Sequence, residues 1–212
     1  MSFSMNDQIK AVIFDVGGVL IRTVDQSGRR YWEDRLNLPP GGAEAIVLNS
    51  PMGYRAQRGE ITTEELWDWV GNYLGLGEHL ADFRHDFWRG DALDHELLAL
   101  IREIRPKYKL AIISNASDIL LETLKEYGLA TEFDLIIGSA YEGIMKPDNA
   151  IFERALQRLD CQPLESVFID DSFANVDAAR SIGMKAIHYS VGLDLRTELR
   201  AIGVGYPVAR VF

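Results

Sequence analysis

Three aspartates, a serine and a lysine lie at or soon after the ends of short apolar runs in this chain. Asp15 ends the run "AVIFD", Ser114 ends "LAIIS", Asp170 and Asp171 end "VFIDD", and Lys146 stands in "IMKPD". If the fold brings them to one place, the three carboxylates repel one another unless a cation lies between them. Mg²⁺ prefers carboxylate, backbone carbonyl and water oxygens as ligands. The sequence therefore predicts a magnesium site.

The other polar groups near these runs are suited to an anion. Lys146 can supply the positive charge that a dianionic phosphoryl group needs, and Ser114 and Asn115 can donate hydrogen bonds to it. Gly17 and Gly18 carry no side chains, so the N–H groups after the first aspartate can approach a phosphate closely. That aspartate, at the tip of a strand beside an open backbone, can serve as a nucleophile.

The apolar runs predict a parallel sheet that would bring these residues together. Five short runs rich in β-branched residues span 10–14, 109–114, 134–139, 166–170 and 185–189. Each is almost continuously apolar, as expected for strands covered on both faces, and helical patterns lie between them. We expect a three-layer, Rossmann-like α/β sandwich. Ligands bind at the carboxyl ends of the strands in such a sheet, where the candidate residues lie.

One long interval interrupts the alternation of strands and helices. Residues 25–95 show no convincing strand, but they contain several helical patterns. One of these begins at Thr62, with Glu65 three residues later, which is the spacing of a capping box. We expect a core domain formed by residues 1–24 and 96–212, and an inserted helical cap domain at 25–95.

Composition narrows the classes of function. The chain has 212 residues, 47 % of them hydrophobic, and a net charge of -10. The acidic balance, without any basic run, argues against nucleic acid as a partner. No apolar run approaches the roughly 20 residues that span a bilayer. Cys161 is the only cysteine, so no intrachain disulfide can form. We expect a soluble, cytoplasmic protein that is a monomer or a homodimer.

Four motifs, in order, resemble those of the haloacid dehalogenase superfamily of hydrolases. They are "FDVGGVL", "IISNAS", "MKPD" and "VFIDDSFANVDAARSIGM". The resemblance implies that Asp15 is the nucleophile, Ser114 binds phosphate and Lys146 pairs with both. It further implies that Asp171 binds Mg²⁺ directly and Asp170 through water. The insert lies where this family places its small helical cap.

The chain departs from the family pattern at Gly17. Phosphatases of this family usually carry a second aspartate there, which protonates the leaving oxygen and then activates water. The backbone carbonyl of Gly17 can still bind the metal, but the residue cannot transfer a proton. General acid–base catalysis contributes about 10²–10⁴-fold, so we expect a weakened enzyme. Leaving groups that depart without protonation, such as a sugar C1 hydroxyl or an acyl group, suffer least.

The insert and the fourth motif contain further candidate residues. Arg55 and Arg58, with Tyr54, could face an anionic substrate, although we expect a solvated helix face. His85 could replace the acid that Gly17 lacks, but we do not expect it to. Asn175 could support the metal site or lie on a helix surface.

The sequence leaves three functions open. The first is a Mg²⁺-dependent phosphatase that acts on a small phosphorylated metabolite, possibly a sugar phosphate, through an aspartyl-phosphate at Asp15. The second is a 2-haloacid dehalogenase with the same nucleophile, which would leave Asp170 and Asp171 without a purpose. The third is a weakly active member that binds a phosphorylated ligand or a protein. We expect the first.

Overall fold

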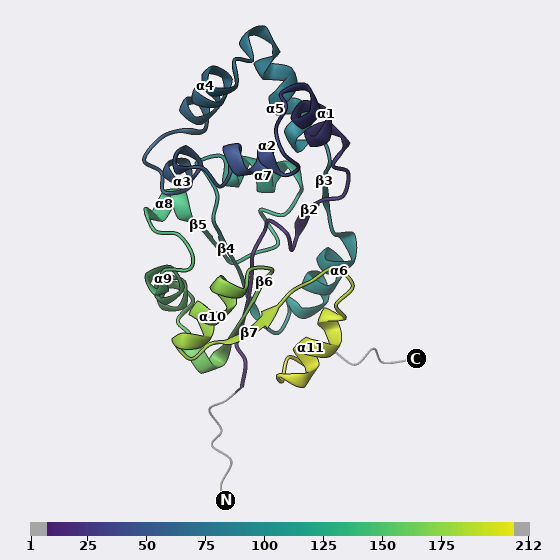
Figure 1. Ribbon diagram of the computed structural model, residues 1–212. Coiled ribbons are helices and arrows are strands. Elements are labelled where there is room, and N and C mark those ends of the chain that lie inside the picture. Colours follow the sequence, from purple (N-terminus) through teal and green to yellow (C-terminus); the bar gives the residue numbers. More distant parts are fainter. Residues whose placement is uncertain (1–7, 206–212) are drawn as a thin grey trace, which may run out of the picture.

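A five-stranded parallel sheet forms the centre of the computed structural model, which describes residues 8–205 (Figure 1). The strands follow the order β5-β4-β1-β6-β7, and all four neighbouring pairs are parallel. Their bounds are β1 Ala11–Phe14, β4 Lys109–Ser114, β5 Leu135–Gly138, β6 Ser166–Asp170 and β7 Lys185–His188. The five predicted strands and their parallel arrangement are confirmed. The third is shorter than expected, because Ser139 begins a helix.

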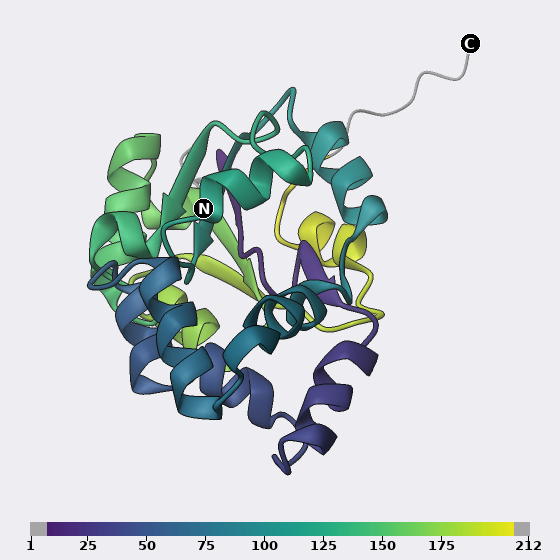
Figure 2. The same ribbon diagram turned by 90° about the horizontal axis from the view of Figure 1, so that it is seen from above.

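Helices cover both faces of this sheet, so the predicted three layers are present (Figure 2). On one face, α6 His95–Ile104, α7 Leu120–Glu126 and α11 Leu195–Ala201 pack on alternate strand residues such as Phe14 and Ile112. On the other, α9 Asn149–Leu159 and α10 Phe173–Ser181 pack on the intervening residues, such as Ile13 and Ile113. Successive side chains of a strand point to opposite faces, which explains the continuous apolar runs.

The helical insert packs around a cluster of its own. Its helices are α1 Ser27–Arg35, α2 Gly42–Val47, α3 Pro51–Gln57, α4 Thr63–Leu74 and α5 Leu80–Trp88, with a 3-10 turn, η1, at Gly77–His79. Trp32, Trp67 and Phe83 are among its buried residues, and the insert lies above the sheet in Figure 1. The capping box at Thr62 and Glu65 is confirmed. The division into two domains stays a prediction.

A small antiparallel ribbon corrects the expectation that no strand lies between residues 25 and 95. It pairs β2 Ile21–Thr23 with β3 Asp91–Leu93, so that Thr23 lies opposite Asp91. The Thr23 hydroxyl donates a hydrogen bond of 2.6 Å to the Asp91 carboxylate. Strands of three residues are too short to show a recognisable alternation of apolar and polar residues. The two chain segments that join the insert to the sheet are therefore hydrogen-bonded to each other.

The remaining elements are short. They are α8 Ser139–Glu142 and the 3-10 turn η2 Pro163–Glu165. Among residues 8–205, no helix combines the length and the apolar character needed to cross a membrane. The outermost residues of the predicted core segments, 1–7 and 206–212, lie outside the described part of the chain.

Candidate active site

Asp15, Asp170 and Asp171 lie together at the carboxyl ends of two neighbouring strands. The backbone N–H of Asp15, the residue after β1, donates a hydrogen bond of 2.9 Å to the carbonyl of Ile169 in β6. One oxygen from each of the three carboxylates lies within 4.8 Å of the others. Asp15 and Asp170 are buried, whereas Asp171 is more exposed. The cluster expected from the strand ends is therefore present.

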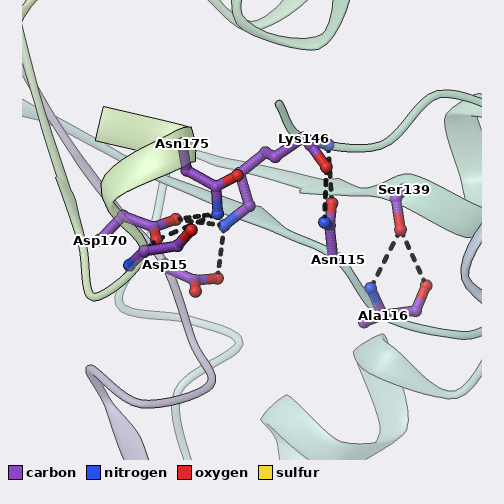
Figure 3. Close-up of polar contacts among 8 residues, drawn as sticks. Asp15, Asn115, Ala116, Ser139, Lys146, Asp170 and Asn175 are labelled. Carbon is purple, nitrogen blue, oxygen red and sulfur yellow. Dashed lines mark hydrogen bonds and ion pairs between the residues drawn. The ribbon is translucent and has the colours of Figure 1, made fainter. Parts of the chain in front are cut away.

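Lys146 lies between the two buried carboxylates (Figure 3). Its Nζ is 2.8 Å from Oδ1 of Asp15 and 2.6 Å from Oδ2 of Asp170. Burial opposes the charge of the ammonium group, but the two carboxylates outweigh it and raise the pKa of Lys146. Lys146 therefore stays charged inside the protein, next to the predicted nucleophile.

The carboxyl groups of this cluster are harder to ionise than ordinary ones. Burial, followed by the charge of Asp170, raises the pKa of Asp15 to about 6, although Lys146 acts against this increase. Burial and the charge of Asp170 also raise the pKa of Asp171. The charge of Lys146 thus balances only part of the negative charge of Asp15, Asp170 and Asp171. This imbalance favours the binding of a further cation.

Asp170 is held by several donors, among them Asn175. The Nδ2 group of Asn175 lies 3.1 Å from each carboxylate oxygen of Asp170, and the Ser172 N–H donates to Oδ1 at 2.8 Å. Both oxygens of Asp170 are therefore engaged, and Asn175 supports the cluster rather than lying on the helix surface. Ser172 precedes α10 at the N-cap position, but its side chain makes no capping hydrogen bond.

Asn115 contacts the chain that carries Lys146. Its Nδ2 donates to the Lys146 carbonyl at 2.9 Å, and its Oδ1 accepts from the Lys146 N–H at 2.8 Å. The side-chain amide thus holds the lysine backbone on both sides, a contact that residue types alone do not reveal. Contact between Asn115 and substrate stays a prediction. Ser114 is buried at the end of β4, beside Gly138 of β5.

Gly17 and Gly18 differ in the space around them. Gly18 has a φ of +76°, which other residues rarely adopt, and a Cβ at this position would overlap the carboxylate of Asp171. Gly17 has no atom within 4 Å of the place where its Cβ would lie. Gly18 is therefore required by the close approach of Asp171, whereas a side chain could be accommodated at Gly17.

The carboxylates fit a small, hard cation. Oxygen is the donor type that Mg²⁺ prefers, and one or two carboxylates are its usual protein ligands. Both oxygens of Asp170 already accept hydrogen bonds or an ion pair. Within the described residues, no ion pair joins Asp171 to another side chain. Asp15 and Asp171 are thus better placed than Asp170 for direct contact with a metal.

A cavity of about 600 Å³ opens beside the cluster, between the insert and the core. Lys146, Asn115 and Asn175 line it from the core, and Tyr54 and Arg58 line it from the insert. Tyr54 and Arg58 thus line the cavity and are also solvated, with 39% of Tyr54 and 38% of the Arg58 side chain exposed. α3, which Arg58 directly follows, contacts α8 of the core.

Two other candidates from the insert lie away from the cluster. Arg55 forms an exposed ion pair of 3.2 Å with Glu60 and is not among the residues that line the cavity. His85 lies in a separate surface pocket on α5, lined also by Arg84 and Trp88. The structure therefore does not bring His85 to the place of the acid that Gly17 lacks.

Comparison with known protein families gives a match over most of the chain. The model of the haloacid dehalogenase-like hydrolases matches residues 9–183. This span begins before β1 and ends after α10, so it includes all the predicted site residues.

Individual relatives and solved structures give the same result. The chain is 30% identical to a sesquiterpene phosphatase of Aspergillus oryzae over 199 residues, which covers 91% of this chain and 96% of that protein. It is 30% identical to a phosphoglycolate phosphatase of Chromobacterium violaceum over 200 residues, covering 87% and 86% of the two chains. An enzyme of the same family from Bacteroides thetaiotaomicron, in complex with magnesium and inorganic phosphate, superposes with a TM-score of 0.74 at 22% identity, covering 91% of this chain and 100% of that one. At this identity the superposition establishes the fold alone.

Proposed function

The chain belongs to the haloacid dehalogenase-like hydrolases, and we propose that it is a Mg²⁺-dependent phosphatase of small phosphorylated metabolites. One observation supports this most strongly: Lys146 is buried between Asp15 and Asp170, with Asp171 beside them. A nucleophilic carboxylate, a fixed cation and a set of oxygen ligands are the groups that phosphoryl transfer requires. The phosphatases among the relatives support the same reaction class.

In this proposal the reaction has two steps at Asp15. A carboxylate oxygen of Asp15 forms a bond to phosphorus as the bond from phosphorus to the leaving oxygen breaks, which releases an alkoxide that takes a proton from water, or a carboxylate where the substrate is an acyl phosphate. Water then attacks the aspartyl-phosphate, restores the carboxylate and releases inorganic phosphate. Lys146 keeps its charge beside the nucleophile and balances the phosphoryl oxygens in both steps. Ser114 and the Gly17 N–H donate hydrogen bonds to these oxygens, whereas the Gly18 N–H donates to the Ile21 carbonyl at 3.0 Å.

The proposed metal ligands are the oxygen atoms of the cluster that are not already engaged by several hydrogen-bond donors. Asp15, Asp171 and the Gly17 carbonyl would hold Mg²⁺ directly, and Asp170 would hold it through water. The bound ion would supply the positive charge that allows an anionic carboxylate to approach a dianionic phosphoryl group. Asn175 and Lys146 fix the orientation of Asp170 behind this set.

Gly17 limits which leaving groups are cleaved quickly. Gly17 has no side chain to donate a proton, and Asp148, the acidic residue on the core side of the cavity, caps α9. The described insert residues that line the cavity are Asn49, Tyr54, Gln57 and Arg58. None of these is a carboxylic acid or a histidine. We therefore expect faster turnover of esters whose leaving group departs as an anion.

Hydrolysis of p-nitrophenyl phosphate tests the proposal, because its leaving group needs no protonation. We expect turnover that requires Mg²⁺, disappears with chelator and is lost in Asp15→Asn. Turnover of 2-chloropropionate without metal would instead indicate the dehalogenase. Binding of phosphate without turnover of either compound would indicate a non-catalytic binding protein. Monomeric or dimeric state, cytoplasmic location and the absence of nucleic acid as a partner stay predictions.

A further inference from the structure

Arg58 is a cation on the insert side of the cavity. It follows α3 directly, and its N–H donates to the Tyr54 carbonyl at 3.0 Å. Lys146 lines the same cavity from the core, but its charge is engaged by Asp15 and Asp170. Arg58 therefore offers the cavity a second positive charge, on the side away from the predicted nucleophile.

The guanidinium group of Arg58 has unused donors. Its Nε donates to Oε1 of Glu60 at 2.6 Å, whereas its two Nη atoms make no hydrogen bond to any described residue. Glu60 also pairs with Arg55, so one carboxylate faces two guanidinium groups and a positive charge remains. Asp148, the acidic residue on the cavity wall, accepts from the Ala150 N–H as the N-cap of α9.

Contacts on both sides of Arg58 hold it against the core. The hydroxyl of Ser139, which is fully buried, donates to the Gln57 carbonyl at 2.6 Å and accepts from the Ala116 N–H at 3.0 Å; Figure 3 shows Ser139 beside Ala116. On the other side, a Cβ at Gly59 would overlap the Ala140 carbonyl. The backbone on either side of Arg58 is therefore held against the core, at the wall of the cavity.

We infer that Arg58 binds a second anionic group of the substrate, a carboxylate or another phosphate. This inference rests on the proposed phosphatase and specifies its substrate: a small phosphate ester with a second negative charge. The phosphoryl group lies at Lys146 and Asp15, and the second anion lies at the Nη atoms of Arg58. A cavity of about 600 Å³ has room for one metabolite that carries both groups. Tyr54 lines the same wall, and its hydroxyl forms hydrogen bonds with polar groups of the substrate that lie between the two anionic groups.

Two pairs of compounds that differ by one charged group test this assignment. The first pair is 3-phosphoglycerate and glycerol 3-phosphate, which differ by a carboxylate. The second is fructose 1,6-bisphosphate and fructose 1-phosphate, which differ by a phosphate. We expect kcat/KM to be at least about 10-fold higher for the compound of one pair that carries the additional anionic group, since hydrogen bonds to charged groups are stronger than those between neutral groups. The pair that responds identifies the anion.

Arg58→Met and Arg55→Met form a matched comparison. Both variants remove one guanidinium group that pairs with Glu60, but only Arg58 lines the cavity. We expect Arg58→Met to reduce the preference for the charged compound by about 10- to 100-fold, mainly through KM. We expect Arg55→Met to keep the wild-type preference. A change confined to KM separates loss of a substrate contact from a disturbed catalytic site.

Two outcomes would overturn the inference. In the first, wild-type protein with Mg²⁺-dependent turnover of p-nitrophenyl phosphate shows no preference within either pair. In the second, the two arginine variants reduce the preference equally, which would indicate a long-range effect of charge. Both outcomes leave the phosphatase itself intact. Absence of p-nitrophenyl phosphate turnover under any metal condition would instead overturn the proposed function.

Discussion

Oδ1 of Asp15 lies 2.8 Å from Nζ of Lys146, with only 11% and 1% of the two side chains exposed. The same ammonium group also contacts Asp170. One buried lysine thus serves two buried carboxylates, and Asp171 adds a further negative charge nearby. Metal-free protein therefore carries uncompensated negative charge at its predicted catalytic site.

Asp15→Asn is expected to stabilise the metal-free protein at pH 8. Burial raises the pKa of Asp15 from 3.8 to about 6, so its ionisation disfavours the folded state. Because the folded protein binds the proton of Asp15 more tightly than the unfolded chain does, this group stabilises the folded protein fully below pH 4. That stabilisation is lost as the pH rises through 6. Each unit of pKa shift corresponds to about 1.4 kcal/mol, so the variant gains up to about 3 kcal/mol. Urea unfolding in chelator at pH 8 measures this difference.

The pH dependence provides the control for the same variant. At pH 4 Asp15 is protonated in the folded wild type, and the advantage of Asp15→Asn should disappear. Mg²⁺ should raise the Tm of the wild type at pH 8 and that of the variant much less. A variant that is less stable than the wild type in chelator at pH 8 would contradict a raised pKa.

Lys146→Met is expected to destabilise the protein and abolish turnover. The variant leaves Asp15 and Asp170 buried without their cation, and removal of one partner from a buried ion pair costs about 3–5 kcal/mol. Denaturant unfolding measures the loss, which should be smaller at pH 5, where Asp15 is mostly protonated. Arg55→Met, which breaks an exposed ion pair with Glu60, is the control and should change stability little. Equal effects of the two variants would contradict the role given to Lys146.

Gly17→Asp is expected to accelerate hydrolysis of esters with poor leaving groups. No atom lies within 4 Å of the place where its Cβ would be, so a carboxyl group can be accommodated. An acid at this position could protonate the leaving oxygen, an effect worth about 10²–10⁴-fold in favourable cases. Rates with an alkyl phosphate should rise relative to those with p-nitrophenyl phosphate. Gly17→Asn, of equal size but without the proton, should show no such change in the ratio.

Gly18→Ala is expected to weaken Mg²⁺ binding. The methyl group would overlap the carboxylate of Asp171, and the φ of +76° disfavours any residue except glycine. Asp171 must move, so the metal site loses its geometry. Titration with Mg²⁺, followed by the shift in Tm, should show a weaker apparent affinity than in Gly17→Ala, where the methyl group meets no neighbour. Equal affinities in the two variants would mean that Asp171 is not a ligand.

Asn115→Ala is expected to lower kcat by about 10- to 100-fold, because a small displacement of a catalytic group can cost that much. The variant removes both hydrogen bonds to the Lys146 backbone. A displaced lysine compensates Asp15 less, so the acidic limb of the pH–rate profile should move to higher pH. Asn149→Ala, at an exposed amide, is the control. An unchanged profile with a lower Tm would indicate a purely structural role for Asn115.

The strand ends could be predicted from the sequence because parallel strands place their carboxyl ends at one edge. That rule brought Asp15 and Asp170 together without knowledge of any contact. The hydrogen bonds of Asn115 and Asn175 could not be predicted, since each joins residues that lie close only in the folded chain. Gly17 and Gly18 look alike in the sequence and differ only in their surroundings. The orientation of Arg58 depended on how α3 lies against α8, which periodicity does not specify.

The ribbon of β2 and β3 joins the two ends of the insert to the rest of the protein, in addition to the contacts that Gln57 and Thr63 make with the core. Thr23 and Asp91 lie opposite each other, so the segment 24–90 leaves and rejoins the core between paired strands. A segment of different length or composition could replace it without changing the distance between these two junctions. The residues assigned to bond cleavage all lie outside this segment, whereas Tyr54 and Arg58 lie inside it. The groups proposed for the reaction and those proposed for substrate selectivity therefore belong to separate segments of the chain, so substitutions within 24–90 are expected to change selectivity and leave the reaction unchanged.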